Sequence, residues 1–271
     1  MAEVLFSTGV PAITEAIEQN LAELLFYFGA ANNATITNTH RLIAVLSDSD
    51  DAFCNAVVHS RLTPERLDEE ILTVLAPFQR RNVPMIWWLM PSAAPPELGK
   101  RLARHGLRYR GEGPGMGLDL TTLPRRRLAP EGLTVELVRT PAALREWLYV
   151  SNVAYGYARE PIEQSVIDFE QRLGLGEKRP YRRYLARLYG RAVATAAIFL
   201  GAGVAGLYNV ATIPQARRHG IGSYTSFVAL REARKAGYCV SVLMASAAGY
   251  HVYTGLGFRE YCRIRSFAWR A

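Results

Sequence analysis

The 271-residue sequence contains few cysteines, almost no lysine and no long apolar run without interruption. Its three cysteines, Cys54, Cys239 and Cys262, are far apart and form no CxxC pair, which argues against a disulfide framework and predicts a cytoplasmic location. The five histidines show no HxxxH or HxxEH spacing, so the sequence predicts no metal site. The N-terminal segment 1–18 has acidic residues and no basic stretch, so it does not resemble a signal peptide.

One segment, residues 192–216, carries no formal charge, but glycine, asparagine and proline divide it into two short runs. These runs are typical of a buried β-hairpin, so no membrane association is predicted. With 49% hydrophobic and 21% charged residues, the composition is that of a globular protein. The length suits two domains of about 130 residues each.

The net charge of +8 favours an anionic partner, and it leaves nucleic acid, a membrane surface and a phosphorylated ligand open. Almost all of the positive charge is arginine, however, because the only lysines are Lys100, Lys178 and Lys235. Arginine in place of lysine on this scale can reflect codon usage. The charge alone therefore carries little functional weight.

The clearest linker is the segment 124–132, PRRRLAPEG, in which prolines and a glycine flank three arginines. After it, the apolar periodicity predicts the order β-α-α-β-β-β-α-β-α-β, a mixed sheet with helices on both sides. Thr140 and Pro141 are predicted to begin the first of these helices. We therefore predict an α/β (mixed α+β) fold with a boundary near residue 126.

The first half ends with a similar series of elements. Thr63 and Pro64 are predicted to begin a helix, and a strand, a short helix and a closing strand follow it. RLARHGLRYR near the end of the first half matches VYTGLGFREY near the end of the second. This match indicates an internal duplication with a period of about 150 residues, although a chance likeness of two α/β halves remains an alternative.

The most informative segment is 210–223, VATIPQARRHGIGS, in which a buried strand leads through a proline and two arginines to a glycine-rich helix start. The first amides of a helix have no internal partner, and the helix dipole places partial positive charge there. Glycines allow those amides to approach phosphate oxygens, and arginines add charge. The spacing fits neither the P-loop nor the dinucleotide G-x-G-x-x-G motif, so the segment predicts a different phosphate site.

These residues resemble a known family. Arg217-x-x-Gly220-x-Gly222, following Pro214, resembles the pyrophosphate motif of the GNAT N-acetyltransferase superfamily. Downstream, Tyr253-Thr-Gly-Leu-Gly-Phe258 resembles the Y-x-x-L-G-F ending of the same family. The resemblance covers residues 131–271. It implies a degenerate GNAT-like lobe over 1–126 and a catalytic GNAT lobe over 127–271, each with a mixed, mostly antiparallel sheet flanked by helices.

The resemblance also implies a function: transfer of an acetyl group from acetyl-CoA, as co-substrate and without a metal, directly to a primary amine in a ternary complex. Tyr253 would be the general acid that protonates the departing thiolate. The backbone of Val210 and Thr212 would bind the pantetheine arm, and Ser246 would lie near the cofactor or cap a helix. The pyrophosphate would be bound by the segment comprising Arg217, Arg218, His219, Gly220, Ile221, Gly222 and Ser223.

The sequence does not identify the general base. The strand before the loop offers only Tyr208 and Asn209, whereas Glu160, Glu163 and Asp168 lie in the helical region expected to cover the acceptor. Exposed helix carboxylates are usually only solvated, and His251 is expected to point away from Tyr253. A water chain is the remaining alternative.

The first half departs from the motif. SRLTPERLDEE contains Arg61 but no glycine, and its acidic residues would repel a pyrophosphate. Leu102 stands where the second half has Tyr253. We therefore expect a non-catalytic lobe that forms one wall of the acceptor pocket.

Three alternatives stay open. The first is a non-catalytic acyl-CoA-binding or sensor module of the same fold. The second is a nucleic-acid-binding protein, suggested by the net charge and by the segment EKRPYRRYLAR. Its arginines alternate with apolar residues, as expected of a strand with one solvated face, so no nucleic-acid partner is predicted. The third is transfer of an acyl group other than acetyl. The acceptor is expected to be a small-molecule or peptide amine, and a homodimer is also open.

Overall fold

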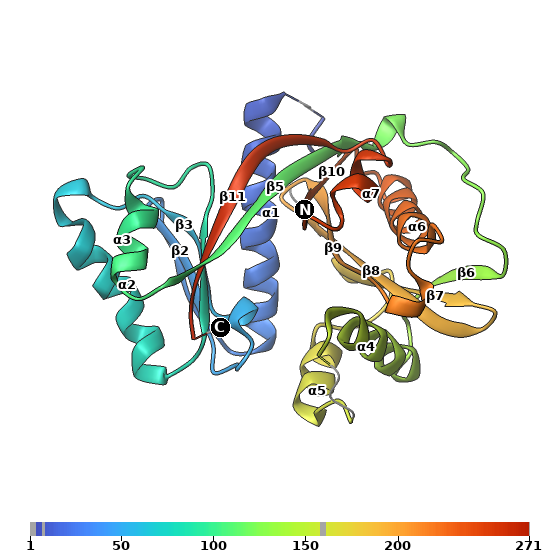
Figure 1. The fold of residues 1–271 in the computed structure, drawn as a ribbon, viewed down its shortest axis with the longest axis horizontal. Coiled ribbons are helices and arrows are strands. Elements are labelled where there is room, and N and C mark those ends of the chain that lie inside the picture. Colours follow the sequence, from blue (N-terminus) through green and yellow to red (C-terminus); the bar gives the residue numbers. More distant parts are fainter. Residues whose placement is uncertain (1–3, 7–8, 158–160, 271) are drawn as a thin grey trace.

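The structure is a computed structural model that describes residues 4–6, 9–157 and 161–270. Figure 1 shows the arrangement of its elements. The helices are α1 (Val10–Ala31), α2 (Leu67–Arg81), α3 (Leu98–Arg104), α4 (Pro141–Tyr155), α5 (Gln164–Arg172), α6 (Ile221–Lys235) and α7 (Tyr250–Thr254). The strands are β1 (Thr35–Asn38), β2 (Leu42–Leu46), β3 (Ala56–Ser60), β4 (Met85–Leu89), β5 (Arg108–Asp119), β6 (Leu133–Leu137), β7 (Tyr181–Leu188), β8 (Arg191–Gly201), β9 (Val204–Thr212), β10 (Val240–Met244) and β11 (Arg259–Trp269).

All of these strands form one sheet in the order β1-β2-β3-β4-β11-β5-β10-β9-β8-β7-β6. Neighbouring strands are antiparallel except for the pairs β3–β4 and β9–β10, which are parallel. The predicted element order of the second half is confirmed from β6 to β11. The mixed, mostly antiparallel character predicted for the sheet is confirmed as well.

The two halves exchange their closing strands. The last strand of the chain, β11, pairs with β4 and β5, and β5 in turn pairs with β10 of the second half. In Figure 1, β5 and β11 run across α1 from one half of the molecule to the other. The sequence predicts a separate sheet for each lobe, and here the structure differs. Closing strands have a local pattern, but the choice of a partner strand is a long-range property that periodicity does not contain.

Helix α1 lies between the two halves and contacts strands of both, including β3, β5, β8 and β9 (Figure 1). Beneath α1, strand β5 has glycine at alternate positions, namely Gly113, Gly115 and Gly117. A Cβ atom at Gly115 would lie 3.1 Å from Ile17 Cδ1, and one at Gly117 would lie 2.7 Å from Ile13 Cγ2. The side-chain-free face of β5 therefore lets α1 pack directly on the sheet.

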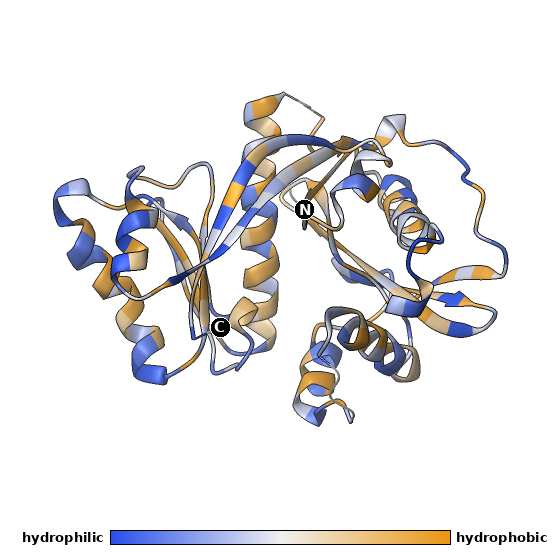
Figure 2. Ribbon diagram, in the orientation of Figure 1, coloured by the Kyte–Doolittle hydropathy of each residue, from blue (hydrophilic) through white to orange (hydrophobic). Residues whose placement is uncertain are grey.

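The helices cover both faces of the sheet. Helices α1, α4 and α5 share one core cluster, which includes Leu25, Trp147 and Ile167. On the opposite face, α2 and α3 pack against the first half, and α6 and α7 pack against the second. Figure 2 shows the apolar residues concentrated on the inner sides of these helices.

Two predicted helix starts can be compared with the structure. Thr140 begins α4 as expected, since its side-chain oxygen accepts a hydrogen bond from the Ala143 amide at 3.2 Å. Thr63 instead precedes a short 3-10 turn, Pro64–Arg66, and makes no side-chain cap there. Its hydroxyl instead donates to Glu70, seven residues later in the first turn of α2. Within the described ranges, no helix combines the length and apolarity needed to cross a membrane.

Candidate functional site

The candidate site begins where β9 and β10 separate. These parallel strands pair only at Ala205–Ser241 and Gly206–Val242, although β9 continues for six residues beyond Gly206. The backbone groups of β9 that would face β10 therefore lack a strand partner. Because unpaired peptide groups between two strands can bond an extended ligand, the gap offers a backbone surface for a chain-like molecule. The predicted residues Val210 and Thr212 both lie in the part of β9 that does not pair with β10, although Thr212 pairs with Ala194 of β8.

A β-bulge shapes the same part of β9. Its pairing with β8 shifts between Thr195 and Ala197, and Asn209 adopts a left-handed backbone conformation with φ of 47°. The Thr195 hydroxyl donates to the Asn209 carbonyl at 2.9 Å, and the Asn209 side chain donates to the Tyr181 hydroxyl at 2.8 Å. These bonds fix a bulge, a feature that bends a strand and redirects its backbone.

The start of α6 presents unpaired amides. Its N-cap, Gly220, has φ of 72° and makes no side-chain cap, and the first turn of the helix contains no acidic residue. The Tyr224 amide bonds the Gly220 carbonyl at 2.9 Å. In the part of the chain that the structure describes, the amides of Ile221, Gly222 and Ser223 have no hydrogen-bond partner. Free amides and the positive end of the dipole together suit a phosphate group.

Glycines leave room around these amides. A Cβ atom at Gly220 would meet no atom within 4 Å, so the space above the helix start is open. A Cβ atom at Gly222 would lie 3.0 Å from Thr212 Oγ1, so this glycine lets the end of β9 approach the first turn of α6. Ile221 is buried in a small core cluster that includes Ala194 and Ala216.

The basic residues of the loop divide into two groups. The Arg217 guanidinium donates to the Thr212 carbonyl at 3.0 Å and to the Ala154 carbonyl at 2.8 Å, so it ties the loop to β9 and α4. Arg218, with φ of 69°, and His219 are exposed beside the helix start. Of the predicted basic residues, Arg217 therefore has a structural contact that the motif alone did not reveal.

The phenol of Tyr253 lies on α7, which follows β10. The residue is 9% exposed, and its ring packs edge-on against Phe258 at 5.9 Å between centroids. A Cβ atom at Gly249 would lie 2.8 Å from Tyr253 Cε2, so this glycine makes space for the ring. Burial raises the pKa of Tyr253 above its usual value near 10, and the neighbouring Tyr155 raises that pKa further. The phenol therefore stays protonated at neutral pH.

Tyr155, which the sequence did not single out, lies beside β9 and acts electrostatically on Tyr253. It is the last residue of α4, its hydroxyl lies 3.5 Å from the Val210 carbonyl, and its phenol acts on the pKa of Tyr253. Ser246 is exposed, and its hydroxyl oxygen accepts from the Gly249 amide at 3.2 Å in the turn before α7. The N-cap of α7 is Gly249, so Ser246 is not the helix cap considered as its alternative role.

The candidate carboxylates for the general base are less informative. Glu160 lies outside the described residues. Glu163 is exposed at the start of α5, and Asp168, also exposed, accepts a hydrogen bond from Gln164 at 2.7 Å. His251 is exposed on α7 and packs edge-on against Tyr250. The contacts of Asp168 and His251 therefore do not identify either of them as the general base.

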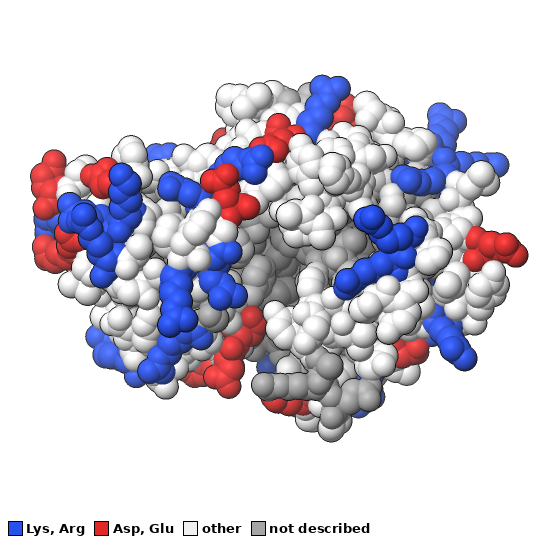
Figure 3. Space-filling model, in the orientation of Figure 1, with Lys and Arg blue, Asp and Glu red and all other residues white. Residues whose placement is uncertain are grey.

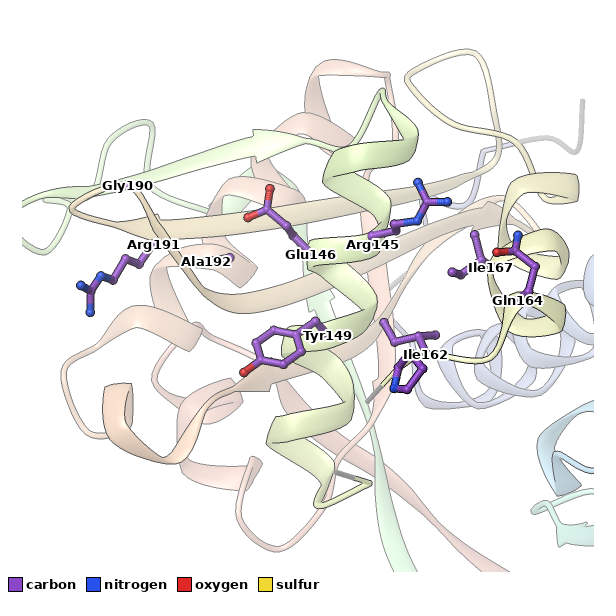
Figure 4. Close-up of a pocket in the computed structure, with 10 residues that line it drawn as sticks. Arg145, Glu146, Tyr149, Ile162, Gln164, Ile167, Gly190, Arg191 and Ala192 are labelled. Carbon is purple, nitrogen blue, oxygen red and sulfur yellow. The ribbon is translucent and has the colours of Figure 1, made fainter. Parts of the chain in front are cut away.

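The structure also has a pocket of about 950 Å³ on the outer side of α4. Figure 4 shows its lining, which comes from α4, from the segment leading into α5 and from the β7–β8 turn. Its carboxylate, Glu146, is bonded by Arg187 at 2.7 and 2.8 Å. None of the predicted site residues lines this pocket. Figure 3 shows a separate hollow between the two halves of the molecule.

The corresponding region of the first half is closed. The parallel strands β3 and β4 also stop pairing early, at Val57–Trp87, but the chain after β4 returns to bridge the gap. The Ala94 amide bonds the Ser60 carbonyl, and the Leu62 amide bonds the Ala94 carbonyl, each at 2.9 Å. At the position of Tyr253, Leu102 is fully buried in the core.

The first-half helix that corresponds to α6 is α2, and it begins with three acidic residues, Asp68, Glu69 and Glu70. Glu70 accepts hydrogen bonds from both the amide and the hydroxyl of Thr63. It is also paired with Arg41 at 3.0 Å. In the first half, three carboxylates therefore lie in the first turn of α2, and one of them is bonded to the segment that leads into the helix.

The comparisons with known proteins support the fold. No family model matches the chain, and no curated protein is similar to it in sequence. A solved GCN5-related N-acetyltransferase from Kribbella flavida matches 92% of this chain and 95% of its own, with 19% identity and a TM-score of 0.69. Another from Sphaerobacter thermophilus matches 86% of this chain and 82% of its own, with 17% identity and a TM-score of 0.60.

A tandem GNAT protein from the clavulanic acid biosynthesis pathway matches 84% of this chain and 78% of its own, with 17% identity and a TM-score of 0.57. Structural matches at sequence identities this low establish the fold alone, and the activity has to be argued from the site. The chain therefore has the GNAT fold, as the loop and tyrosine motifs predicted.

Proposed function

We propose that the second half of the chain binds acetyl-CoA and transfers its acetyl group to a primary amine. One observation carries this proposal: the gap between β9 and β10 leads directly to the uncapped start of α6. An extended arm fits the gap, and a pyrophosphate fits the free amides at its end. The pyrophosphate would contact the amides from Arg218 to Ser223, and the pantetheine arm would bond the backbone of Val210 and Thr212.

In the proposed reaction, both substrates are bound at once. The amine nitrogen attacks the thioester carbonyl carbon, the carbon–sulfur bond breaks as the tetrahedral intermediate collapses, and the amine proton leaves to water. Tyr253, kept protonated by its buried position, donates its proton to the departing sulfur. Because the interaction with sulfur is strongest as negative charge develops, its effect falls on the rate of the chemical step.

The acceptor is proposed to be a small-molecule or peptide amine that enters from the hollow between the halves (Figure 3). Helices α1, α4 and α5 lie on the same face of the sheet, and the first half forms the opposite wall. The three cysteines are free, which fits a reducing compartment such as the cytoplasm.

An assay of coenzyme A release with a panel of polyamines, amino sugars, amino acids and peptides tests the proposal. We expect at least one amine to stimulate release well above the rate of hydrolysis without amine. Tight acetyl-CoA binding with no transfer to any amine would instead support a GNAT-fold acyl-CoA-binding module. Absence of binding would contradict both functions.

A further inference from the structure

Helix α1, which belongs to the first half of the chain, carries one polar side chain into the second half. Asn20 is fully buried. Its Nδ2 atom donates to the Gly201 carbonyl at 2.8 Å, and its Oδ1 atom accepts a hydrogen bond from the Tyr208 hydroxyl at 2.8 Å. Burying an amide is costly unless its hydrogen bonds are made, so this arrangement is a specific one.

The backbone beneath Asn20 is shaped to receive it. A Cβ atom at Gly206 would lie 1.9 Å from Asn20 Oδ1 and 2.4 Å from Tyr208 Cε2. Both side chains therefore occupy the space that any other residue at position 206 would fill. The ring of Tyr208 consequently lies over Gly206, where Asn20 holds its hydroxyl.

Tyr208 lies on β9 between the last pair with β10 and the β-bulge. It comes two residues after Gly206, the last residue of β9 that pairs with β10, and it directly precedes the bulge residue Asn209. Burial raises the pKa of the Tyr208 hydroxyl well above its usual value, so the phenol remains a hydrogen-bond donor to Asn20. The bond thus lies at the point where the strands part.

We propose that Asn20 is a positioning residue for the cofactor gap: by holding the Tyr208 ring over Gly206, it keeps that ring out of the space between β9 and β10 and fixes the start of the bulge. The inference rests on the proposed function, since the gap is the place assigned to the pantetheine arm. It also gives the first half a role besides that of a wall, because the second half receives this contact from α1.

The contact is tested by Tyr208→Phe, which removes only the hydroxyl, and by Asn20→Ala. A matched control is Glu23→Ala. Glu23 lies one turn further along α1 and accepts a hydrogen bond from the Ala202 amide at 2.7 Å, so it ties the same helix to the same β8–β9 turn without touching Tyr208. Acetyl-CoA affinity is measured by calorimetry, and KM and kcat are measured at a temperature where all variants are folded.

We expect Tyr208→Phe and Asn20→Ala to weaken acetyl-CoA binding and raise its KM about tenfold, with little change in kcat, because a misplaced gap would weaken binding equally in the ground and transition states. Glu23→Ala should lower thermal stability and leave KM unchanged. The double variant Asn20→Ala with Tyr208→Phe should show no larger KM than Asn20→Ala alone, since both changes remove one interaction.

Two results would overturn the inference in different ways. If wild type binds acetyl-CoA and both Tyr208→Phe and Asn20→Ala bind it equally well, Asn20 is only structural and the proposed function stands. An equal rise of KM in Glu23→Ala would lead to the same conclusion. If wild type binds no acetyl-CoA, the proposed function fails, and the role of Asn20 fails with it.

Discussion

The carboxylate of Glu70, in the first turn of α2, is bonded to both the backbone amide and the hydroxyl of Thr63, each at 2.9 Å. In the second half, the matching helix α6 has neither an acidic residue nor a cap in its first turn. The acidic first turn of α2 repels a pyrophosphate by its charge, and Glu70 occupies the Thr63 amide. We therefore predict that one chain binds one acetyl-CoA. Calorimetric saturation at two per monomeric chain would contradict the closed first half.

The same contact predicts a pH dependence of stability. Hydrogen bonding from the Thr63 amide is the main cause that lowers the pKa of Glu70, and partial burial opposes it. A carboxyl with a lowered pKa in the folded state contributes stability above its unfolded value, 4.5, and this contribution is lost as the pH falls through the folded pKa. Glu70→Gln should therefore reduce the free energy of unfolding at neutral pH.

Its difference from wild type should shrink as the solution is acidified below the unfolded value. Urea unfolding at a series of pH values measures this difference. A difference that stays constant into strong acid would show that the charge of Glu70, in its contact with Thr63, does not contribute to the free energy of unfolding.

The catalytic role proposed for Tyr253 predicts a loss of rate in its phenylalanine variant. Tyr253→Phe keeps the ring and its contact with Phe258, so the fold and acetyl-CoA affinity should be retained. A positioned general acid contributes about a hundredfold to ten-thousandfold, and we expect the lower end because a thiolate is a fairly good leaving group. The loss should appear in kcat, measured with an amine that wild type acetylates.

Tyr238→Phe is a matched control, because Tyr238 precedes β10 at the end remote from the gap. It should keep the wild-type kcat. A wild-type kcat in Tyr253→Phe would assign Tyr253 to packing, and the acyl-CoA-binding module would then be the better account.

Local patterns predicted much of the second half. The strand, loop and helix around Gly220 and Gly222 were predicted because glycine placement and apolar periodicity are properties of neighbouring residues. The element order from β6 to β11 followed from the same signals. The motifs also led to the GNAT fold, although no family model matches the chain.

Long-range relationships were not predicted. The pairing of β11 with β4, the contact of Asn20 with Tyr208 and the approach of Tyr155 to Val210 join residues far apart in the sequence. One signal was present and unused: β5 has glycine at positions 113, 115 and 117, which marks one bare face of a strand. Such a face predicts close packing of another element, here α1.

The placement of the cofactor is tested best by a charge at the start of α6. Gly220 has a left-handed backbone, so a side chain there would add strain to any effect of charge. Ser223 is the third residue of the helix and its amide is free. Ser223→Glu places a carboxylate where the helix dipole favours it, so thermal stability should be unchanged or higher. Ser223→Gln has nearly the same shape and no charge.

The decisive measurement is a calorimetric titration of wild type, Ser223→Gln and Ser223→Glu with acetyl-CoA. If the first turn of α6 binds the pyrophosphate, Ser223→Gln should bind within a few-fold of wild type. Ser223→Glu should lose at least about tenfold in affinity, which corresponds to about 1.4 kcal/mol of charge repulsion. Wild-type affinity in Ser223→Glu, in a protein that is folded and binds one acetyl-CoA, would place the cofactor elsewhere and contradict the assignment of the site.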